Sequence, residues 1–251
     1  MRENRLKAIW EEGRAATNCW LTIPSPYIAE AMGGQGWDTA TIDMQHGMIR
    51  MADAYGLLTA LSTTDCVPIV RVPWNEPGII MSALDAGAYG IICPMINTRD
   101  ECERFVGACR YAPDGYRSVG PNRAVLYGGP DYLSKANETI VTLAMVETKQ
   151  ALDNLEEICS VPGLDAILIG PADLGLSLGR QPRGDQTDEV VVEAIDHILA
   201  AVKKHGLRAA IVNSSVDYAK QMIDKGFDLV TVTSDMGLLR GGAALNKAMQ
   251  D

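Results

Sequence analysis

The chain has 251 residues, of which 47% are apolar and 22% are charged, and its formal net charge is -10. This composition allows a large buried core and argues against intrinsic disorder. The acidic balance would repel a phosphate backbone, which argues against nucleic acid as a partner, and no apolar run is long enough to span a membrane.

Eight short runs of apolar and β-branched residues recur along the chain. Most are continuously apolar, which is typical of strands that are buried on both faces of a sheet. The predicted strands are 18–23, 37–44, 67–72, 90–95, 141–146, 166–170, 208–213 and 229–233.

Helix signals fill the intervals between these runs. Serine or threonine opens several of the segments and glycine closes them, as expected at helix caps. The predicted helices are 54–64, 77–87, 98–110, 151–160, 188–206 and 214–226. The charged stretch 1–13 is helical in pattern and lacks the apolar centre of a signal peptide. Segment 111–130, rich in Gly, Pro and Arg, is predicted to be a long irregular loop, and loops of this length are usually functional or mobile.

This alternation of strands and helices predicts a definite fold class. Eight βα units without a break in composition favour a (β/α)8 TIM barrel that occupies residues 1–251 as a single domain. The alternative is an open doubly wound sheet, although the chain has no G-x-G-x-x-G motif after an early strand. The six cysteines form no C-x-x-C pair, which predicts reduced thiols in a cytoplasmic protein.

Polar residues follow the predicted strands at their carboxyl ends, where barrel enzymes place their active sites. These residues are Asp43, Gln45, His46, Arg71, Glu147, Gly170, Pro171, Ala172, Asp173, Asn213, Ser234 and Asp235. Glu147 and Asp173 follow adjacent strands, and two converging carboxylates repel one another unless a cation lies between them or one is protonated. Oxygen ligands suit Mg²⁺ or Mn²⁺, with Co²⁺ or Zn²⁺ as alternative ions. The competing interpretation is that each acid caps the helix that follows it.

Three further groups at this edge have candidate roles. Arg71 is expected to contact an anionic substrate, or else to form a salt bridge with Asp43 or Glu147. His46 is the one histidine predicted near the strand ends, and it is either a general base or a structural loop residue. The GPADLG segment, 170–175, can present backbone N–H groups to a carboxylate, or it is an ordinary turn.

Several other mechanisms are disfavoured by the residues that the chain lacks at these positions. No lysine ends a predicted strand, which argues against a Schiff-base aldolase. Three histidines are too few for a zinc site built from several of them. Neither a G-x-S-x-G motif nor a P-loop is present.

With these residues placed, the chain resembles the HpcH/HpaI aldolases, which are metal-dependent class II pyruvate aldolases. The resemblance extends over most of the chain. It depends on six ordered motifs, namely IDMQHG, PIVRVPW, ALDAGAYGIICPMI, GYRSVGP, AMVETKQALDNLEEI and IGPADLGLSLG. Each motif is weakly specific alone, and their order makes the set specific.

The resemblance implies a barrel whose C-terminal helix is swapped with a neighbour in a homo-oligomer, commonly a hexamer built as a trimer of dimers. It implies that Glu147 and Asp173 bind the metal, that His46 is the base and that Arg71 stabilises an enolate oxygen. Backbone N–H groups of Ala172 and Asp173, within the segment that starts at Gly170 and Pro171, would hold the keto acid. Asp85 would support the histidine of a neighbouring subunit, a role that only the resemblance suggests.

Two residues depart from the pattern of the family. Gln45 stands where many members have glutamate, and Met145 stands where many have glutamine, so the preference for a particular aldehyde or keto acid is open. The predicted activity is reversible cleavage of 4-hydroxy-2-oxo acids to pyruvate or hydroxypyruvate plus an aldehyde. The alternatives are a CoA-ester lyase of the citrate-lyase-β or malyl-CoA type, for which Arg117 and Arg123 are the available basic residues, and a non-catalytic ligand-binding barrel.

Overall fold

The computed structural model describes residues 1–250 and contains one closed barrel of eight parallel strands, each paired with the next and the last paired with the first. The strands are β1 Ala16–Leu21, β2 Thr39–Asp43, β3 Val67–Arg71, β4 Gly90–Cys93, β5 Val141–Val146, β6 Ala166–Ile169, β7 Arg208–Ile211 and β8 Leu229–Ser234. All eight predicted strands are therefore present, and the TIM-barrel prediction is confirmed.

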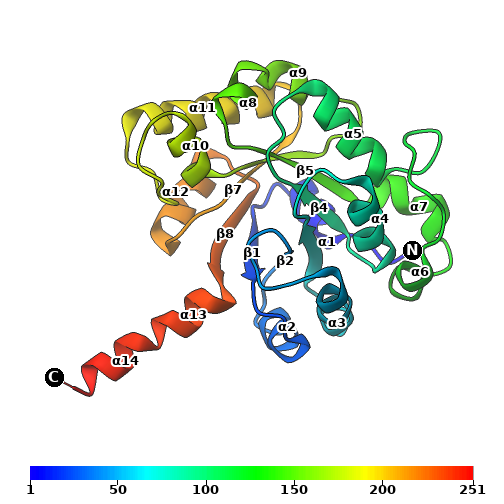
Figure 1. Cartoon of the computed structure of the whole chain (residues 1–251), viewed down its shortest axis with the longest axis horizontal. Helices are drawn as coiled ribbons and strands as arrows, with labels where there is room; N and C mark the ends of the chain where they lie inside the picture. The colour runs from blue at the N-terminus through cyan, green and yellow to red at the C-terminus, as the bar shows by residue number, and fades with distance from the viewer. Residues whose placement is uncertain (251) are drawn as a thin grey trace.

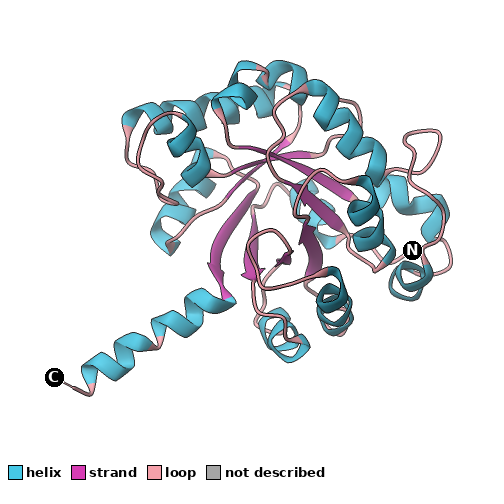
Figure 2. Cartoon of the chain, viewed as in Figure 1, coloured by secondary structure: helices cyan, strands magenta, loops and turns pink. Residues whose placement is uncertain are grey.

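Most of the helices surround the strands on the outside of the barrel (Figure 1; Figure 2). The helices of the described chain are α1 Arg5–Glu11, α2 Pro26–Gly33, α3 Met51–Leu61, α4 Pro77–Asp85, α5 Arg99–Cys109, α6 Asn122–Gly128, α7 Tyr132–Thr139, α8 Lys149–Asp153, α9 Leu155–Cys159, α10 Pro171–Ser177, α11 Glu189–Lys204, α12 Val216–Lys225, α13 Asp235–Gly241 and α14 Ala243–Ala248. None of the helices within residues 1–250 combines the length and the apolar character needed to cross a membrane.

Two helix predictions need correction. The helix predicted at 151–160 is interrupted at Asn154, whose side chain donates a hydrogen bond to the Asn97 carbonyl at 2.8 Å and which separates α8 from α9. Segment 111–130 is not irregular throughout, because α6 occupies its second half and follows directly on Pro121. Proline is compatible with the start of a helix, where its missing N–H leaves no bond unmade.

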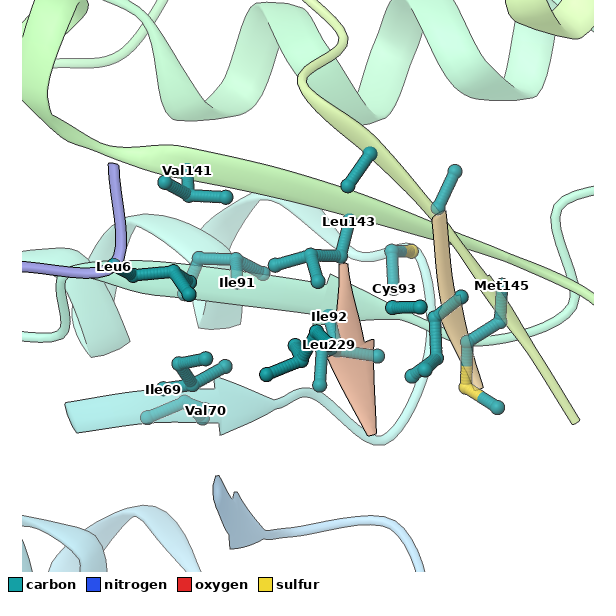
Figure 3. Close-up of a cluster of buried hydrophobic side chains, with 14 of the residues drawn as sticks. Leu6, Ile69, Val70, Ile91, Ile92, Cys93, Val141, Leu143, Met145 and Leu229 are labelled. Atoms are coloured by element: carbon teal, nitrogen blue, oxygen red, sulfur yellow. The ribbon is translucent and has the colours of Figure 1, made fainter. Parts of the chain in front are cut away.

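The centre of the barrel is filled mainly by branched apolar side chains. Ile69, Ile92, Leu143 and Leu229, from four different strands, are at most 3% exposed and belong to one buried cluster (Figure 3). This packing is what a barrel of eight strands requires, since its interior is just wide enough to be filled by side chains. The core therefore fixes the strand register, and with it the positions of the residues at the carboxyl ends.

The chain after β8 leaves the barrel. The α13 and α14 helices extend away from the body of the molecule (Figure 1), and Leu238 and Leu239 of α13 are 53% and 60% exposed. Ser234 accepts the N-cap hydrogen bond of α13 from the Gly237 N–H. The junction is thus a well-formed helix start.

Asp235, the first residue of α13, ties the last strand to the first. Its buried carboxylate accepts hydrogen bonds from the Thr22 and Ile23 N–H groups at 2.8 and 2.9 Å, and from the Thr22 hydroxyl at 2.6 Å. Its own helix contributes the Met236 N–H at 2.7 Å. Asp235 is therefore a structural residue that holds the end of β1 against α13.

We expect Asp235→Asn to lower the free energy of unfolding by about 2–4 kcal/mol, because the amide places an NH2 group against donors that lose a charged acceptor. Urea unfolding followed by circular dichroism measures this loss. Asp224→Asn, at an exposed position on α12, is the control and should be neutral within about 0.5 kcal/mol. Equal effects of the two substitutions would contradict the role of Asp235.

Candidate active site

The predicted polar residues do meet at the carboxyl ends of the strands, and the sheet register explains why. Asp43 and Arg71 end adjacent strands and are paired directly in register. Val146 of β5 is paired with Ile169 of β6, so the next residues, Glu147 and Gly170, leave the sheet side by side. Two pairs of neighbouring strands therefore bring four of the predicted positions to one edge.

Arg71 is held by two different contacts. Its Nε and Nη2 donate to the two carboxylate oxygens of Asp43 at 2.9 and 2.6 Å, and the centre of the Trp20 ring lies 4.3 Å from its Cζ. The Nη1 atom faces only a weak acceptor, the Met145 sulfur at 3.9 Å. The salt bridge anticipated for Arg71 is thus formed with Asp43, and Nη1 keeps its hydrogen-bonding capacity for another acceptor.

Asp43 also shapes the loop that carries the histidine. Its Oδ1 accepts hydrogen bonds from the Gln45 and His46 N–H groups at 3.1 and 3.2 Å. Gly47 allows this turn to fold back, because a Cβ there would lie 2.2 Å from the Asp43 carbonyl oxygen. Asp43 therefore orients the His46 backbone, while the exposed imidazole makes no hydrogen bond to the part of the chain that the structure describes.

Glu147 is a buried carboxylate, only 3% exposed. Burial raises its pKa to about 7, the Met95 N–H that donates to Oε1 at 2.9 Å lowers it, the charge of Asp173 raises it and that of Arg71 lowers it. Burial is the largest cause because it removes water from the charged form. The charges of Asp173 and Arg71 thus act on the pKa of Glu147 in opposite directions.

Sequence reasoning missed the loop that supports Glu147. Met95 has a φ of 56°, which is a strained backbone conformation for a side chain of this size. The Asn97 side chain holds it there by donating to the Met95 carbonyl at 2.9 Å, and the Ile96 N–H donates to the Met145 carbonyl at 3.1 Å. Strain is concentrated at functional sites, but no feature of the letters PMIN predicts a positive φ at methionine.

Gly170 and Asp173 occupy the start of α10 beside Glu147. A Cβ on Gly170 would lie 2.3 Å from the Glu147 Oε2, so glycine is required for this carboxylate to keep its place. Asp173 is exposed in the first turn of α10, which begins at Pro171, so it lies inside the helix and not at its cap position. Gly170 provides no side-chain cap, so the first-turn N–H groups of Ala172 and Asp173 are left without one.

Comparison with known proteins shows the family to which this chain belongs. Residues 16–241 match the model of the HpcH/HpaI aldolase/citrate lyase family. The chain belongs to this family.

Relatives of known name and structure agree with the family match. The chain is 42% identical to a hydroxypyruvate/pyruvate aldolase of Rhizorhabdus wittichii over 96% of both chains. It is 34% identical to a 5-keto-4-deoxy-D-glucarate aldolase of Citrobacter koseri, covering 94% of this chain and 92% of the relative. A crystal structure of an HpcH/HpaI aldolase/citrate lyase family protein from Burkholderia cenocepacia superimposes with a TM-score of 0.91, 32% identity, and coverage of 99% and 100%. The prediction that this protein is an aldolase is thereby confirmed.

Asp85 is not brought to this HpcH/HpaI site within one chain. It ends α4, a helix that starts after the carboxyl end of β3 and runs back to the amino end of β4, so it lies at the opposite face of the barrel. There Asp85 accepts a hydrogen bond from the buried Arg117 at 2.7 Å, and Arg117 also donates to the Tyr132 hydroxyl at 3.1 Å. Any part that Asp85 has in the chemistry needs a second chain.

The two acids suit an oxygen-preferring divalent ion. Within residues 1–250 no three His, Cys, Asp or Glu side chains gather closely enough to hold a metal by themselves. The Glu147 Oε2 and both oxygens of Asp173 accept no hydrogen bond from the described chain, so they remain available as ligands. Mg²⁺ and Mn²⁺ are commonly held by one or two carboxylates, with water and substrate in the other positions. The donor set fits such an ion.

Glu147→Gln should stabilise the metal-free protein, and more so at higher pH. Since the folded-state pKa is raised from 4.5 to about 7, the unfolded chain loses its proton first, and this carboxyl makes folding less favourable as pH rises through that window. The cost reaches about 3 kcal/mol above pH 7, and a neutral amide removes it.

Thermal unfolding in EDTA at pH 5, 6, 7 and 8 measures the effect. The advantage of Glu147→Gln should grow across this series, while Glu193→Gln, at an exposed position on α11, should show no trend. A difference between Glu147→Gln and the unchanged protein that is independent of pH would contradict the burial argument.

Proposed function

We propose that this protein is a divalent-metal-dependent aldolase that reversibly cleaves 4-hydroxy-2-oxo acids to pyruvate or hydroxypyruvate and an aldehyde. The observation that carries the proposal is the single edge at which Glu147 and Asp173 keep free oxygens beside the uncommitted Nη1 of Arg71. The relatives named as aldolases support the same reaction class.

Each residue has a defined task in this reaction. Glu147 and Asp173 would hold Mg²⁺ or Mn²⁺, with Co²⁺ or Zn²⁺ as alternatives, and the bound ion would supply Lewis-acid polarisation of the 2-oxo group. Arg71 directs Nη1 at the oxygen on which enolate charge develops, where a preorganised donor lowers the barrier. His46 moves the proton to and from the hydroxyl that becomes the aldehyde oxygen. Uncapped N–H groups of Ala172 and Asp173, in the turn formed by Gly170 and Pro171, orient the substrate carboxylate.

A direct assay tests this function. The purified protein is incubated with pyruvate or hydroxypyruvate and an aldehyde, in Mg²⁺ or Mn²⁺ and again after EDTA treatment. Condensation that requires the cation supports the proposal, and turnover that survives complete metal removal overturns the metal-dependent mechanism. Unchanged turnover in His46→Ala would remove histidine from the role of base.

The CoA-ester lyase alternative depended on two basic residues, and both guanidinium groups are already bonded within the chain. Arg117 is buried and paired with Asp85. Arg123 donates to the Thr59 hydroxyl at 3.0 Å, to the Leu58 carbonyl at 3.0 Å and to the Ala86 carbonyl. Neither guanidinium is free to bind the diphosphate of CoA. In the assay, cleavage of malyl-CoA without any reaction of free aldehydes would favour this alternative.

We further propose a homo-oligomer, a hexamer built as a trimer of dimers, in which α13 and α14 pack on a neighbouring chain. The exposed Leu238 and Leu239, and the apolar groove that they form with Ile28 and Met32 of α2, support an apolar contact with a second copy. In such an assembly Asp85 of one chain would support His46 of another, as the family resemblance implies.

Replacing Leu238 and Leu239 together by serine should reduce the molar mass measured by light scattering on a sizing column, because the apolar area buried between chains is lost. Val190→Ser, at an exposed position on α11, is the control and should leave the mass unchanged. A molar mass of one chain for the unaltered protein would refute the assembly.

Arg71→Lys should reduce kcat/KM for aldol cleavage on the order of 100-fold. Lysine cannot bind both oxygens of Asp43 and still present a second donor to the substrate. Arg99→Lys, in an exposed pair with Glu103, is the matched control and should have wild-type kinetics. An Arg71→Lys enzyme within threefold of wild type would show that the guanidinium geometry does not matter.

A further inference from the structure

The barrel interior beneath Arg71 is polar on one side, unlike the apolar cluster across from it. Asn18 of β1 is 2% exposed, and its Oδ1 accepts hydrogen bonds from the Thr39 and Thr41 hydroxyls of β2 at 2.8 and 2.9 Å. Its Nδ2 donates to the Thr231 hydroxyl of β8 at 3.3 Å. A buried amide is costly unless it is hydrogen-bonded, and this one is bonded through both of its polar atoms.

The network continues upward through a tryptophan. The Trp20 Nε1 donates to the Thr231 hydroxyl oxygen at 2.9 Å, so one oxygen accepts from both Asn18 and Trp20. Trp20 is 6% exposed and Thr231 is 4% exposed. Because neither group can exchange this bond for one to bulk water, the hydroxyl determines how the indole is oriented.

The Trp20 indole in turn supports the guanidinium of Arg71. Asp43 binds one edge of the guanidinium through Nε and Nη2, while Cζ lies over the Trp20 ring, 4.3 Å from its centre. The carboxylate fixes rotation within the plane of the guanidinium, and the aromatic face fixes the tilt of that plane. The direction of Nη1 depends on both constraints.

We propose that Thr231 is a positioning residue for the aldolase reaction, acting on Arg71 through the indole of Trp20. This inference rests on the proposed function, because it assumes that Nη1 of Arg71 stabilises the developing enolate. Thr231 lies below the site on β8, and the Trp20 ring connects it to Arg71.

Two substitutions in one network separate positioning from simple packing. Thr231→Val keeps the shape and removes the acceptor of the Trp20 N–H, whereas Thr39→Val removes a hydroxyl that donates to Asn18 and is not the hydrogen-bond partner of Trp20. We expect Thr231→Val to lower kcat about tenfold with KM for the 2-oxo acid within threefold. Thr39→Val should lower the unfolding midpoint without changing the kinetics. Thr231→Ser restores the hydroxyl and should recover kcat to within threefold of wild type.

A double-substitution cycle identifies Arg71 as the group through which Thr231 acts. In an Arg71→Lys background, Thr231→Val should cost less than twofold more, because the guanidinium that it positions is already absent. A full tenfold loss in that background would overturn the proposal. Equal kinetic losses in Thr39→Val and Thr231→Val would also overturn it, since they would indicate a general packing effect.

Two further measurements keep the result decisive. If Thr231→Val does not fold, Trp20→Phe keeps an aromatic face without the N–H, and wild-type kcat in that variant would overturn the proposal. If the unaltered protein turns over no 2-oxo acid, the proposed function has failed, and crystal structures of wild type and Thr231→Ser or Trp20→Phe still decide the positioning. We expect the Arg71 guanidinium to be displaced from the ring in Trp20→Phe and to keep its position in Thr231→Ser. An unmoved Arg71 in Trp20→Phe would overturn the inference.

Discussion

The bidentate ion pair between Arg71 and Asp43 is the interaction on which the site depends. It occurs because the last residues of β2 and β3 are paired in register. The pair uses one edge of the guanidinium, formed by Nε and Nη2, and leaves Nη1 directed into the site, while a carboxylate oxygen of Asp43 also holds the backbone of His46. One contact between adjacent strands thus orients a cation, a loop and a candidate base together.

Glu147 illustrates a conflict between folding and chemistry. Burying a carboxylate beside Asp173 makes its charged form unfavourable, which is why its pKa rises to about 7. Two features hold the Glu147 carboxylate in place despite this cost. The strained Met95 backbone donates its N–H to Oε1, and the absence of a Cβ at Gly170 leaves room for Oε2. A cation between two acids would relieve the same repulsion, so a destabilising arrangement in the bare protein is a favourable one for a metal site.

Much of this molecule could be predicted from local pattern. Runs such as VTLAMV and AILIG are too apolar to be half-exposed, and parallel strands place their carboxyl ends together, so Glu147 and Asp173 were expected to converge. The interruption at Asn154 and the helix within 111–130 could not be predicted in the same way. The break depends on an Asn97 carbonyl 57 residues away along the chain, and neither propensity nor periodicity contains that contact.

The order of apolar runs, caps and polar strand ends was enough to establish the barrel, the family resemblance and the set of residues at its edge. Those features depend on spacing along the chain, which the letters record directly. Tertiary structure decided the contacts. Arg71 pairs with Asp43 and lies over Trp20, which is bonded to Thr231. Asp85 lies at the opposite face of the barrel, paired with Arg117. Hydrogen bonds and aromatic contacts act over a few ångströms, whereas Trp20 and Thr231 are 211 positions apart along the chain, so only closure of the barrel brings them together.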